Sequence, residues 1–308
     1  MGNYKILIAG GGTGGHLFPA LAIGEEIHRR EQNARIHYVG SSFGLEAKVF
    51  PVKDVWHTLL PIRGFQRDMS LQSWGRNILL PSRIIRSILK MRTLLKEFLP
   101  NVIVGTGGYA AALPLFMATK REEPLPIVLQ EQNSFPGLTT RWFSEKAQAT
   151  CVAFNEASDH LKSNTIFTGN PVRRDIDNGD RIQGAGEFNL AQDINTIFLF
   201  GGSQGSTFLN KMMNKISDNV SKAGIQVLWQ TGDAEYSKYK GKDSDQIRVV
   251  PFIQNMASAY ALADLVICRS GALTIAEITV CGKPSILVPF PFAAGDHQTK
   301  NAQSLVNA

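Results

Sequence analysis

Two glycine-rich turns hold the residues best suited to chemistry in this chain. The first lies in KILIAGGGTGGHLFPALAI from Lys5, and the second in TIFLFGGSQGSTFLNKMM from Thr196. In each, an apolar run passes through glycines into a helical pattern, so backbone N–H groups converge at a helix start and favour an anion by about 0.3–1 kcal/mol. The alternative interpretation is that the glycines serve only to form a tight turn between strand and helix. This explanation is better suited to a single loop than to several loops in one chain. The pair predicts a phosphate-bearing ligand.

A third segment, RSGALTIAEI from Arg269, offers a grip on a ribose. Its first residues end a strand, and Ala272 to Thr274 begin a helix whose N–H groups are free for phosphate. Glu277 follows one turn later on the same helix face, where it could accept hydrogen bonds from a ribose diol. Alternatively, Glu277 is simply an acidic residue favoured near the start of a helix. The spacing leaves both interpretations open.

The first glycine turn formally matches a dinucleotide-binding motif, because residues 10–15 fit G-x-G-x-x-G. Such a site also needs an acidic residue at the end of the second strand, and RIHYVGSS ends without one. This absence argues against a nicotinamide or flavin enzyme. A P-loop would place lysine where His16 stands, which argues against nucleoside triphosphate hydrolysis.

The elements that must position these turns alternate between apolar runs and helix-like segments, which predicts parallel sheets covered on both faces. The expected strands are KILIAG, RIHYVG, NVIVGTGG, PIVLQEQ, ATCVAF and TIFTGNP in the first half, and TIFLFGG, IQVLWQTG, IRVVPF, DLVICRSG and PSILVPF in the second. We therefore predict an α/β protein with two Rossmann-like domains whose sheets face each other across a cleft. The polar, glycine-containing stretch 170–195 marks the boundary, giving domains 1–168 and 169–308.

Composition is typical of a globular protein with about two domains: 308 residues, 44% hydrophobic and 19% charged. No apolar stretch approaches the roughly 18 residues of a membrane span, and the N-terminus resembles a first strand more than a signal sequence, so we expect a cytoplasmic protein.

Cys151, Cys268 and Cys281 lack disulfide or zinc spacing and are expected to be reduced thiols. The chain stops within a helical pattern, QTKNAQSLVNA, as a shortened sequence would.

Positive charge is concentrated in the N-terminal half, where residues 1–150 hold 18 Lys and Arg against 11 Asp and Glu. The segment 81–91 predicts a basic amphipathic helix beside an apolar turn. Its apolar side would carry Ile84, Ile85, Ile88 and Met91, its basic side Arg83, Arg86 and Lys90, and the turn Leu79 and Leu80. Such a helix can rest on anionic lipid at about 1 kcal/mol per cation, or pack as an ordinary helix with solvated arginines. No nucleic-acid motif accompanies the charge, so no nucleic acid partner is expected.

Six loop motifs, spread in order along the whole chain, resemble those of the MurG family. They are GGTGGH from Gly11, GTGGY from Gly105, EQN from Glu131, GNPVR from Gly169, GGSQG from Gly201 and CRSGALTIAEI from Cys268. Members of this family transfer N-acetylglucosamine from UDP-GlcNAc to an undecaprenyl-linked muramyl-pentapeptide at the membrane. The resemblance implies a GT-B fold, an inverting transfer that needs no cofactor, and a place on the cytoplasmic face of the bacterial cell membrane.

The resemblance also implies roles for individual residues. Donor contacts are expected from Thr13, Gly14, Gly15, Asn133, Arg173, Ser203 (diphosphate), Ile253 (uracil, through its backbone), Ala272, Leu273, Thr274, Ile275, Ala276, Glu277 and Gln298 (sugar). Acceptor contacts are expected from the N–H groups of Gly105, Thr106, Gly107, Gly108 and Tyr109. His16 suits general base catalysis, typically worth about 10²–10⁴-fold, although it could instead hydrogen-bond the donor sugar or cap its own loop.

Two features limit what the resemblance implies. GDHQTKNA carries His297 where some relatives have a second glutamine, so Gln298 is the clearer sugar contact. Asp175-Ile-Asp177 and Asp243-Ser-Asp245 have the spacing by which other glycosyltransferases hold a metal, but their polar surroundings favour solvated loops, and no metal site is predicted.

Two alternative functions remain open at this point. One is a UDP-sugar transferase with another lipid or small-molecule acceptor, and the other is a non-catalytic nucleotide-sugar binding module.

Overall fold

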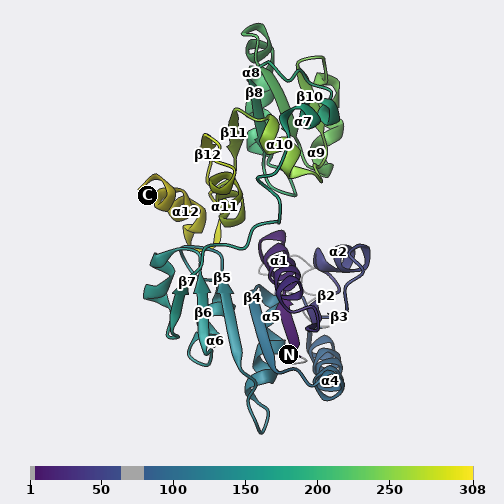
Figure 1. The fold of residues 1–308 in the computed structure, drawn as a ribbon, viewed down its shortest axis with the longest axis vertical. Helices are drawn as coiled ribbons and strands as arrows, with labels where there is room; N and C mark the ends of the chain where they lie inside the picture. Colours follow the sequence, from purple (N-terminus) through teal and green to yellow (C-terminus); the bar gives the residue numbers. More distant parts are fainter. Residues whose placement is uncertain (1–3, 64–79, 308) are drawn as a thin grey trace. The chain divides into compact units, whose positions relative to one another are not determined.

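The computed structural model describes residues 4–63 and 80–307, which form two compact units divided between Pro171 and Val172 (Figure 1). The division lies three residues beyond the boundary expected after residue 168. Asn170 explains part of this difference. Its side chain hydrogen-bonds Gln130 and the carbonyl of Gln132, so this segment is attached to the first unit.

In the described residues, the first unit contains a seven-stranded parallel sheet with the order β3-β2-β1-β4-β5-β6-β7. Its strands are β1 (Lys5–Gly10), β2 (Arg35–Ser41), β3 (His57–Leu60), β4 (Val102–Gly107), β5 (Ile127–Glu131), β6 (Ala149–Val152) and β7 (Thr165–Phe167). Its helices are α1 (Gly14–Arg30), α2 (Glu46–Val52), α4 (Leu80–Phe98), α5 (Tyr109–Thr119) and α6 (Leu138–Ser144), with a 3₁₀ turn at Asn155–His160.

The second unit, as described, contains a five-stranded parallel sheet with the order β10-β9-β8-β11-β12. Its strands are β8 (Thr196–Phe200), β9 (Gln226–Gln230), β10 (Ile247–Val250), β11 (Leu265–Cys268) and β12 (Ser285–Leu287). Its helices are α7 (Arg181–Phe188), α8 (Thr207–Lys222), α9 (Asp233–Tyr239), α10 (Met256–Leu262), α11 (Ala272–Val280) and α12 (His297–Val306), with 3₁₀ turns at Lys240–Lys242 and Ala294–Asp296.

Both sheets are covered on both faces, as the unbroken apolar strands predict. Successive strand residues point to opposite faces, and in β1 Leu7 and Ala9 join a core with α4, α5 and α6. Ile6 and Ile8 join a second core with α1 and α2. The second unit repeats this plan, with α7, α10 and α11 on one core and α8 and α9 on the other.

The second sheet repeats the order of strands β3-β2-β1-β4-β5 of the first, which confirms the prediction of two Rossmann-like α/β domains. In each, the order reverses beside the first strand, between β1 and β4 or between β8 and β11. Ligands of open parallel sheets bind beyond the carboxyl ends of the strands at this reversal. The glycine turns and the start of α11 lie at these positions. Two elements were not expected from the sequence: the four-residue edge strand β3, and α7, which lies within the stretch 170–195 expected to mark the boundary.

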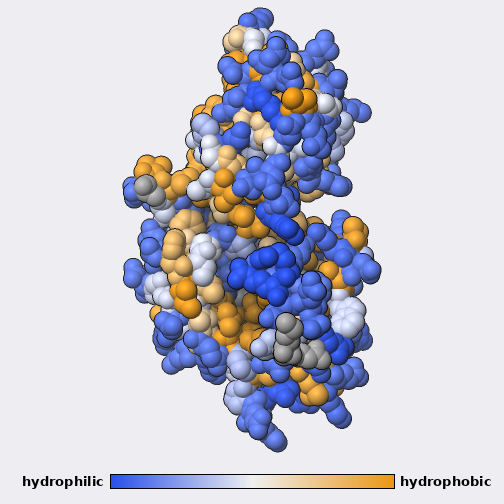
Figure 2. All heavy atoms as spheres, viewed as in Figure 1, coloured by the Kyte–Doolittle hydropathy of each residue, from blue (hydrophilic) through white to orange (hydrophobic). Residues whose placement is uncertain are grey.

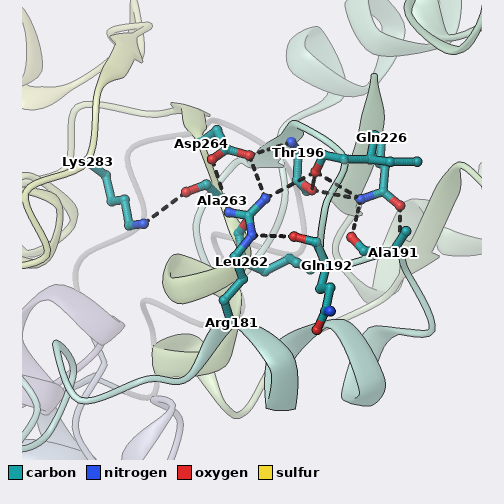
Figure 3. A network of polar contacts seen from close by, with 10 residues as sticks. Arg181, Ala191, Gln192, Thr196, Gln226, Leu262, Ala263, Asp264 and Lys283 are labelled. Carbon is teal, nitrogen blue, oxygen red and sulfur yellow. Dashed lines mark hydrogen bonds and ion pairs between the residues drawn. The ribbon is translucent and has the colours of Figure 1, made fainter. Parts of the chain in front are cut away.

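An ion pair fixes the start of the second unit (Figure 3). Arg181 of α7 donates to both carboxylate oxygens of Asp264, at 3.0 and 2.9 Å, and the N–H of Thr196 donates to one of them at 2.8 Å. Burial opposes ionisation of Asp264, but the hydrogen bonds from Arg181 and Thr196 outweigh it and leave its pKa lowered. The pair therefore links α7 to the strands β8 and β11.

We expect Asp264→Ala to lower the free energy of unfolding by about 1–2 kcal/mol, because it leaves the Thr196 N–H without its acceptor and removes the carboxylate that pairs with Arg181. The loss is modest because the pair is partly solvated and because Arg181 keeps its hydrogen bonds to backbone carbonyls. The pKa of Asp264 is lower in the folded protein than in the unfolded chain. Its carboxylate therefore stabilises the fold fully above the unfolded pKa of about 3.9, and this stabilisation is lost as the pH falls through the folded pKa. Urea denaturation should show the deficit at pH 7 and a smaller one near pH 3. Equal losses of unfolding free energy at the two pH values would contradict this role of the Asp264 carboxylate.

Within the described residues, no helix is long and apolar enough to cross a membrane. The three cysteines are unpaired, Cys268 fully buried and the other two partly so. Neither observation assigns a function to the residues concerned.

Candidate active site

His16 lies in the first turn of α1, at the strand-order reversal of the first unit, with its ring half-buried. Its Nδ1 lies 3.0 Å from the carbonyl oxygen of Thr106 and 2.9 Å from Oε1 of Gln132. Both neighbours are acceptors, so Nδ1 carries the proton and Nε2 keeps a lone pair. The ring is therefore held in the form that can accept a proton through Nε2.

The GTGGY segment packs against the His16 ring. Gly105, Thr106 and Gly107 lie in β4 and are buried, and Gly105 pairs with strands on both sides. Cβ atoms added to Gly107 and Gly108 would lie 3.0 Å from the His16 ring, so glycine is required for this close packing. Only Gly108 and Tyr109 lie at the start of α5. The acceptor contacts expected of the five N–H groups remain a prediction.

The first glycine turn already holds an anion from the protein itself. The carboxylate of Glu46, at the start of α2, accepts from the Gly12 N–H at 3.0 and 2.9 Å and from the Ser41 N–H at 2.7 Å. Glu46 is fully buried, and its side chain occupies the space where Gly11, Gly40 and Gly44 lack a Cβ. The Gly12 N–H therefore has an acceptor within the protein, and phosphate binding at this turn remains a prediction. Thr13 and Gly15 lie beside the turn and are exposed.

The EQN motif orders the loop after β5. Glu131 is buried, and its carboxylate accepts from the N–H and side-chain amide of Asn133 and from the Gly137 N–H, at 3.1–3.3 Å. Asn133 is thereby fixed at the carboxyl end of β5, on the same edge of the sheet as His16. Glu131 and Gln132 belong to the EQN motif, but their residue types and spacing predict no role for either of them.

In the second unit, Glu277 lies in α11 with only 7% of its surface exposed. One carboxylate oxygen lies 3.1 Å from Nε of Arg173, and the other accepts from the Tyr260 hydroxyl at 3.0 Å. Burial raises the pKa of Glu277, against the opposing influence of Arg173 and Tyr260. The structure thus brings together two predicted donor residues, Arg173 and Glu277, from segments about a hundred positions apart.

The start of α11 has the predicted form. Gly271 is its N-cap, the helix begins at Ala272, and Ile275 makes the first intrahelical bond to Gly271. Ala272 and Ile275 face the core, whereas Leu273, Thr274 and Ala276 are half-buried. The hydroxyl of Ser270, just before the helix, is fully buried and has no hydrogen-bond partner among the described residues. A hydroxyl in this position can donate to an anion at the helix start.

The second glycine turn leaves Ser203 exposed, while its helix α8 is capped by Ser206, whose hydroxyl accepts from the Leu209 N–H. Gln230, at the end of β9, connects this turn to the loop of Ile253. Its amide nitrogen donates to the Gly202 carbonyl at 3.0 Å, and its oxygen accepts from the Ile253 N–H at 2.8 Å. A ligand can therefore use the Ile253 N–H only by displacing Gln230.

Gln298 lies at the beginning of α12, the helix that packs against α11. Its Oε1 accepts from the Phe290 N–H at 2.9 Å. Further along α12, Asn301 reaches the carbonyl oxygen of Ser270 at 3.5 Å. The predicted sugar contact and the helix start expected to hold phosphate are therefore joined within the second unit.

Comparison with known proteins assigns the chain to a family. Residues 6–152 match the glycosyltransferase family 28 N-terminal domain, and residues 196–308 match its C-terminal domain. Two curated relatives carry the name UDP-N-acetylglucosamine--N-acetylmuramyl-(pentapeptide) pyrophosphoryl-undecaprenol N-acetylglucosamine transferase. The one from Flavobacterium psychrophilum is 38% identical over 100% of this chain and 83% of its own length, and the one from Cytophaga hutchinsonii is 40% identical over 98% and 81%. The chain belongs to the MurG family.

Solved structures agree with this assignment. The crystal structure of Acinetobacter baumannii MurG has a TM-score of 0.69 and 26% identity, covering 99% of this chain and 83% of that one. A kitacinnamycin glycosyltransferase, at 15% identity and a TM-score of 0.67, is similar in fold. The two parallel sheets of this MurG family member therefore form the GT-B architecture expected from its sequence.

The helix predicted to face a membrane differs in detail from the sequence expectation. Met91 is fully buried in the core, whereas Ile85 is 58% and Leu89 56% exposed, so the four expected apolar residues do not form one face. The helix packs instead through Ser87, Met91, Leu94, Leu95 and Phe98. The guanidinium of Arg83 lies over the Phe43 ring, at 5.1 Å. Arg86 and Lys90 are exposed, Leu80 is half-buried, and Leu79 lies outside the described residues.

The two D-x-D segments have partners within the protein. Asp243 accepts from Arg248 at 2.6 Å and from the Val249 N–H at 2.8 Å, and Asp175 accepts from the Asn178 amide at 3.0 Å. Among the described residues, no group of three or more His, Cys, Asp or Glu is arranged to hold a metal ion. These aspartates therefore have local structural contacts.

Proposed function

We propose that this protein transfers N-acetylglucosamine, with inversion, from UDP-GlcNAc to the 4-hydroxyl of the muramyl sugar of undecaprenyl-pyrophosphoryl-MurNAc-pentapeptide, converting lipid I to lipid II. The observation that carries the proposal is His16, held through Nδ1 so that Nε2 can take a proton. The names of curated relatives that align with 98–100% of the chain support the choice of donor and acceptor.

In the proposed reaction, Nε2 of His16 removes the proton from the acceptor hydroxyl as its oxygen bonds to the anomeric carbon of the sugar. The bond from that carbon to the diphosphate breaks, and UDP leaves with the negative charge. Thr13, Gly14, Gly15 and Asn133 are proposed to contact the donor sugar from the first unit. Gly108 and Tyr109, at the start of α5, are half-buried and are proposed to contact the acceptor diphosphate.

The second unit is proposed to bind the donor. The start of α11 and the turn of Ser203 hold the diphosphate, and Glu277 accepts from the ribose hydroxyls. The loop of Ile253 receives the uracil, and Gln298 receives the sugar. Arg173, already paired with Glu277, supplies a permanent positive charge beside this group. No cofactor takes part in the proposed chemistry.

A radiolabelled transfer assay tests the proposal directly. Label from UDP-GlcNAc should appear in the lipid fraction when undecaprenyl-pyrophosphoryl-MurNAc-pentapeptide is present. Transfer only to another lipid or small acceptor would replace the proposed acceptor. Calorimetric binding of UDP-GlcNAc with no transfer to any acceptor would make the chain a nucleotide-sugar binding module and overturn the proposal.

We further propose that the first unit rests on the cytoplasmic face of the bacterial cell membrane, through α4 and α5. A groove of about 490 Å³ lies between these helices. Its apolar residues include Ile88, Leu99, Phe116 and Met117, and its cations are Arg92, Lys96, Lys120 and Arg121. Figure 2 shows hydrophobic residues reaching the protein surface among hydrophilic ones. Apolar side chains beside cations suit an anionic lipid surface.

Charge reversal on α4 is expected to weaken this contact. The double variant Arg92→Glu, Lys96→Glu changes two exposed cations of this groove and should reduce binding to anionic vesicles by at least about tenfold, since each cation near such a surface contributes about 1 kcal/mol. Vesicle cosedimentation at low and high salt measures the change. The matched control is Lys211→Glu, Lys215→Glu, which has the same spacing and charge change on exposed α8 positions. Equal losses in the two double variants, or none in either, would contradict the assignment to α4.

A further inference from the structure

Gln132 lies directly after β5 and is almost fully buried, with 2% of its surface exposed. Its amide nitrogen donates to the carbonyl of Thr106 at 2.8 Å and to that of Gln130 at 3.2 Å, and it also contacts the side-chain oxygen of Gln130. Three oxygens around one end of an amide require that end to be nitrogen. The orientation of the Gln132 side chain is therefore fixed by its surroundings, and its oxygen faces His16.

This orientation determines the tautomer of His16. Nδ1 faces Oε1 of Gln132 at 2.9 Å and the Thr106 carbonyl at 3.0 Å, and neither oxygen can donate. Moving the ring proton to Nε2 would place the Nδ1 lone pair against two oxygen atoms and would leave Oε1 of Gln132 without the His16 donor, which is costly at a partly buried site. The Thr106 hydroxyl also donates to the His16 carbonyl at 2.8 Å, so ring and backbone are held from one segment.

Gln132 is itself held by the GNPVR segment. The Asn170 amide nitrogen donates to the Gln132 carbonyl at 2.9 Å, and its oxygen accepts from the Gln130 amide at 3.1 Å. A chain of neutral amides thus runs from Asn170 through Gln130 and Gln132 to His16. These amides fix the ring without placing a negative charge beside it.

We propose that Gln132 is a positioning residue, which fixes the Nδ1-protonated tautomer of His16 and leaves Nε2 to act as the base. The catalytic part of this inference rests on the proposed function. The tautomer part does not, because it concerns the resting protein alone.

The test combines nitrogen NMR with turnover. In the unaltered protein, ¹⁵N spectra should show His16 protonated at Nδ1 and unprotonated at Nε2 above pH 7.5. Gln132→Met should mix the two tautomers and lower kcat about tenfold, with both KM values within about threefold, because one of the two acceptors is lost. The control Gln226→Met removes an equally buried glutamine that holds Ala191 and Thr196 of the second unit. It should lower the melting temperature without changing the His16 spectrum or kcat.

An Nε2-protonated His16 in the unaltered protein would overturn the proposal, even if Gln132→Met did not fold. So would a folded Gln132→Met protein with an unchanged His16 spectrum. If the tautomer mixes as expected while His16→Ala keeps its turnover, Gln132 still positions the ring, and only the assignment of His16 as base fails.

Discussion

Replacing His16 with alanine is expected to lower kcat by about 10²–10⁴-fold and to leave the KM for UDP-GlcNAc within about threefold. The expected size is that of a lost general base. The affinity is spared because the ring is occupied by Thr106 and Gln132 through Nδ1, and the proposed donor contacts lie mainly on the second unit. Steady-state kinetics with a lipid acceptor measures both constants.

Two further variants separate catalysis from packing. His16→Gln can still hydrogen-bond but cannot take a proton at neutral pH, so it should be as inactive as His16→Ala. His28→Ala alters an exposed histidine in the last turn of the same helix, and it should keep full turnover. Near-normal kcat in His16→Gln would show that this residue only hydrogen-bonds the sugar or its own loop.

Replacing Glu277 with alanine is expected to raise the KM for UDP-GlcNAc by about 10–10²-fold, with a smaller change in kcat. Hydrogen bonds between charged groups and their partners are worth about 1.5–3 kcal/mol, or roughly one to two powers of ten. Burial raises the pKa of Glu277, so this carboxylate becomes protonated at a higher pH than an exposed glutamate does. As the pH of the unaltered protein is lowered, the KM for UDP-GlcNAc should therefore begin to rise at a higher pH than it would with an exposed glutamate. Kinetics between pH 5 and 8 measures both effects.

Tyr260→Phe is the matched variant for this prediction. It removes the hydroxyl that donates to Glu277 at 3.0 Å while leaving the carboxylate in place. It should change the donor KM by no more than about threefold, although it affects the same buried group. If Tyr260→Phe were as damaging as Glu277→Ala, the effect of Glu277 would come from packing of α11 and not from the ribose. Unfolding measurements on both variants verify that the second unit remains folded.

The sheets and their turns were predictable because they depend on short-range patterns. Unbroken apolar runs such as Phe198–Phe200 identify strands buried on both faces, and glycines mark the turns that follow them. β3 was missed because four edge residues carry little periodic signal. α7 was missed because it contains two glycines, of which Gly184 lets the helix approach α10: a Cβ there would lie 2.6 Å from the Ser258 carbonyl oxygen.

The supporting residues of the site were less predictable, because their partners are distant in sequence. Glu46 reaches Gly12 across 34 positions, so no motif around the first turn indicates that its N–H groups are already occupied. Gln132 reaches His16 across 116 positions. A helical wheel for α4 likewise shows how often apolar residues recur, but it does not show which side of the helix faces the core. It therefore grouped Ile85 with Met91, although only Met91 is buried.

A crystal structure of the protein with UDP-GlcNAc tests the central claim most directly. The account predicts density for the diphosphate at the start of α11, beside Ala272 and the turn of Ser203, with the ribose within hydrogen-bond distance of the Glu277 carboxylate. Diphosphate density on the first glycine turn, in place of the Glu46 carboxylate, would contradict it. So would the absence of nucleotide density from a crystal whose protein shows no heat of UDP binding in solution.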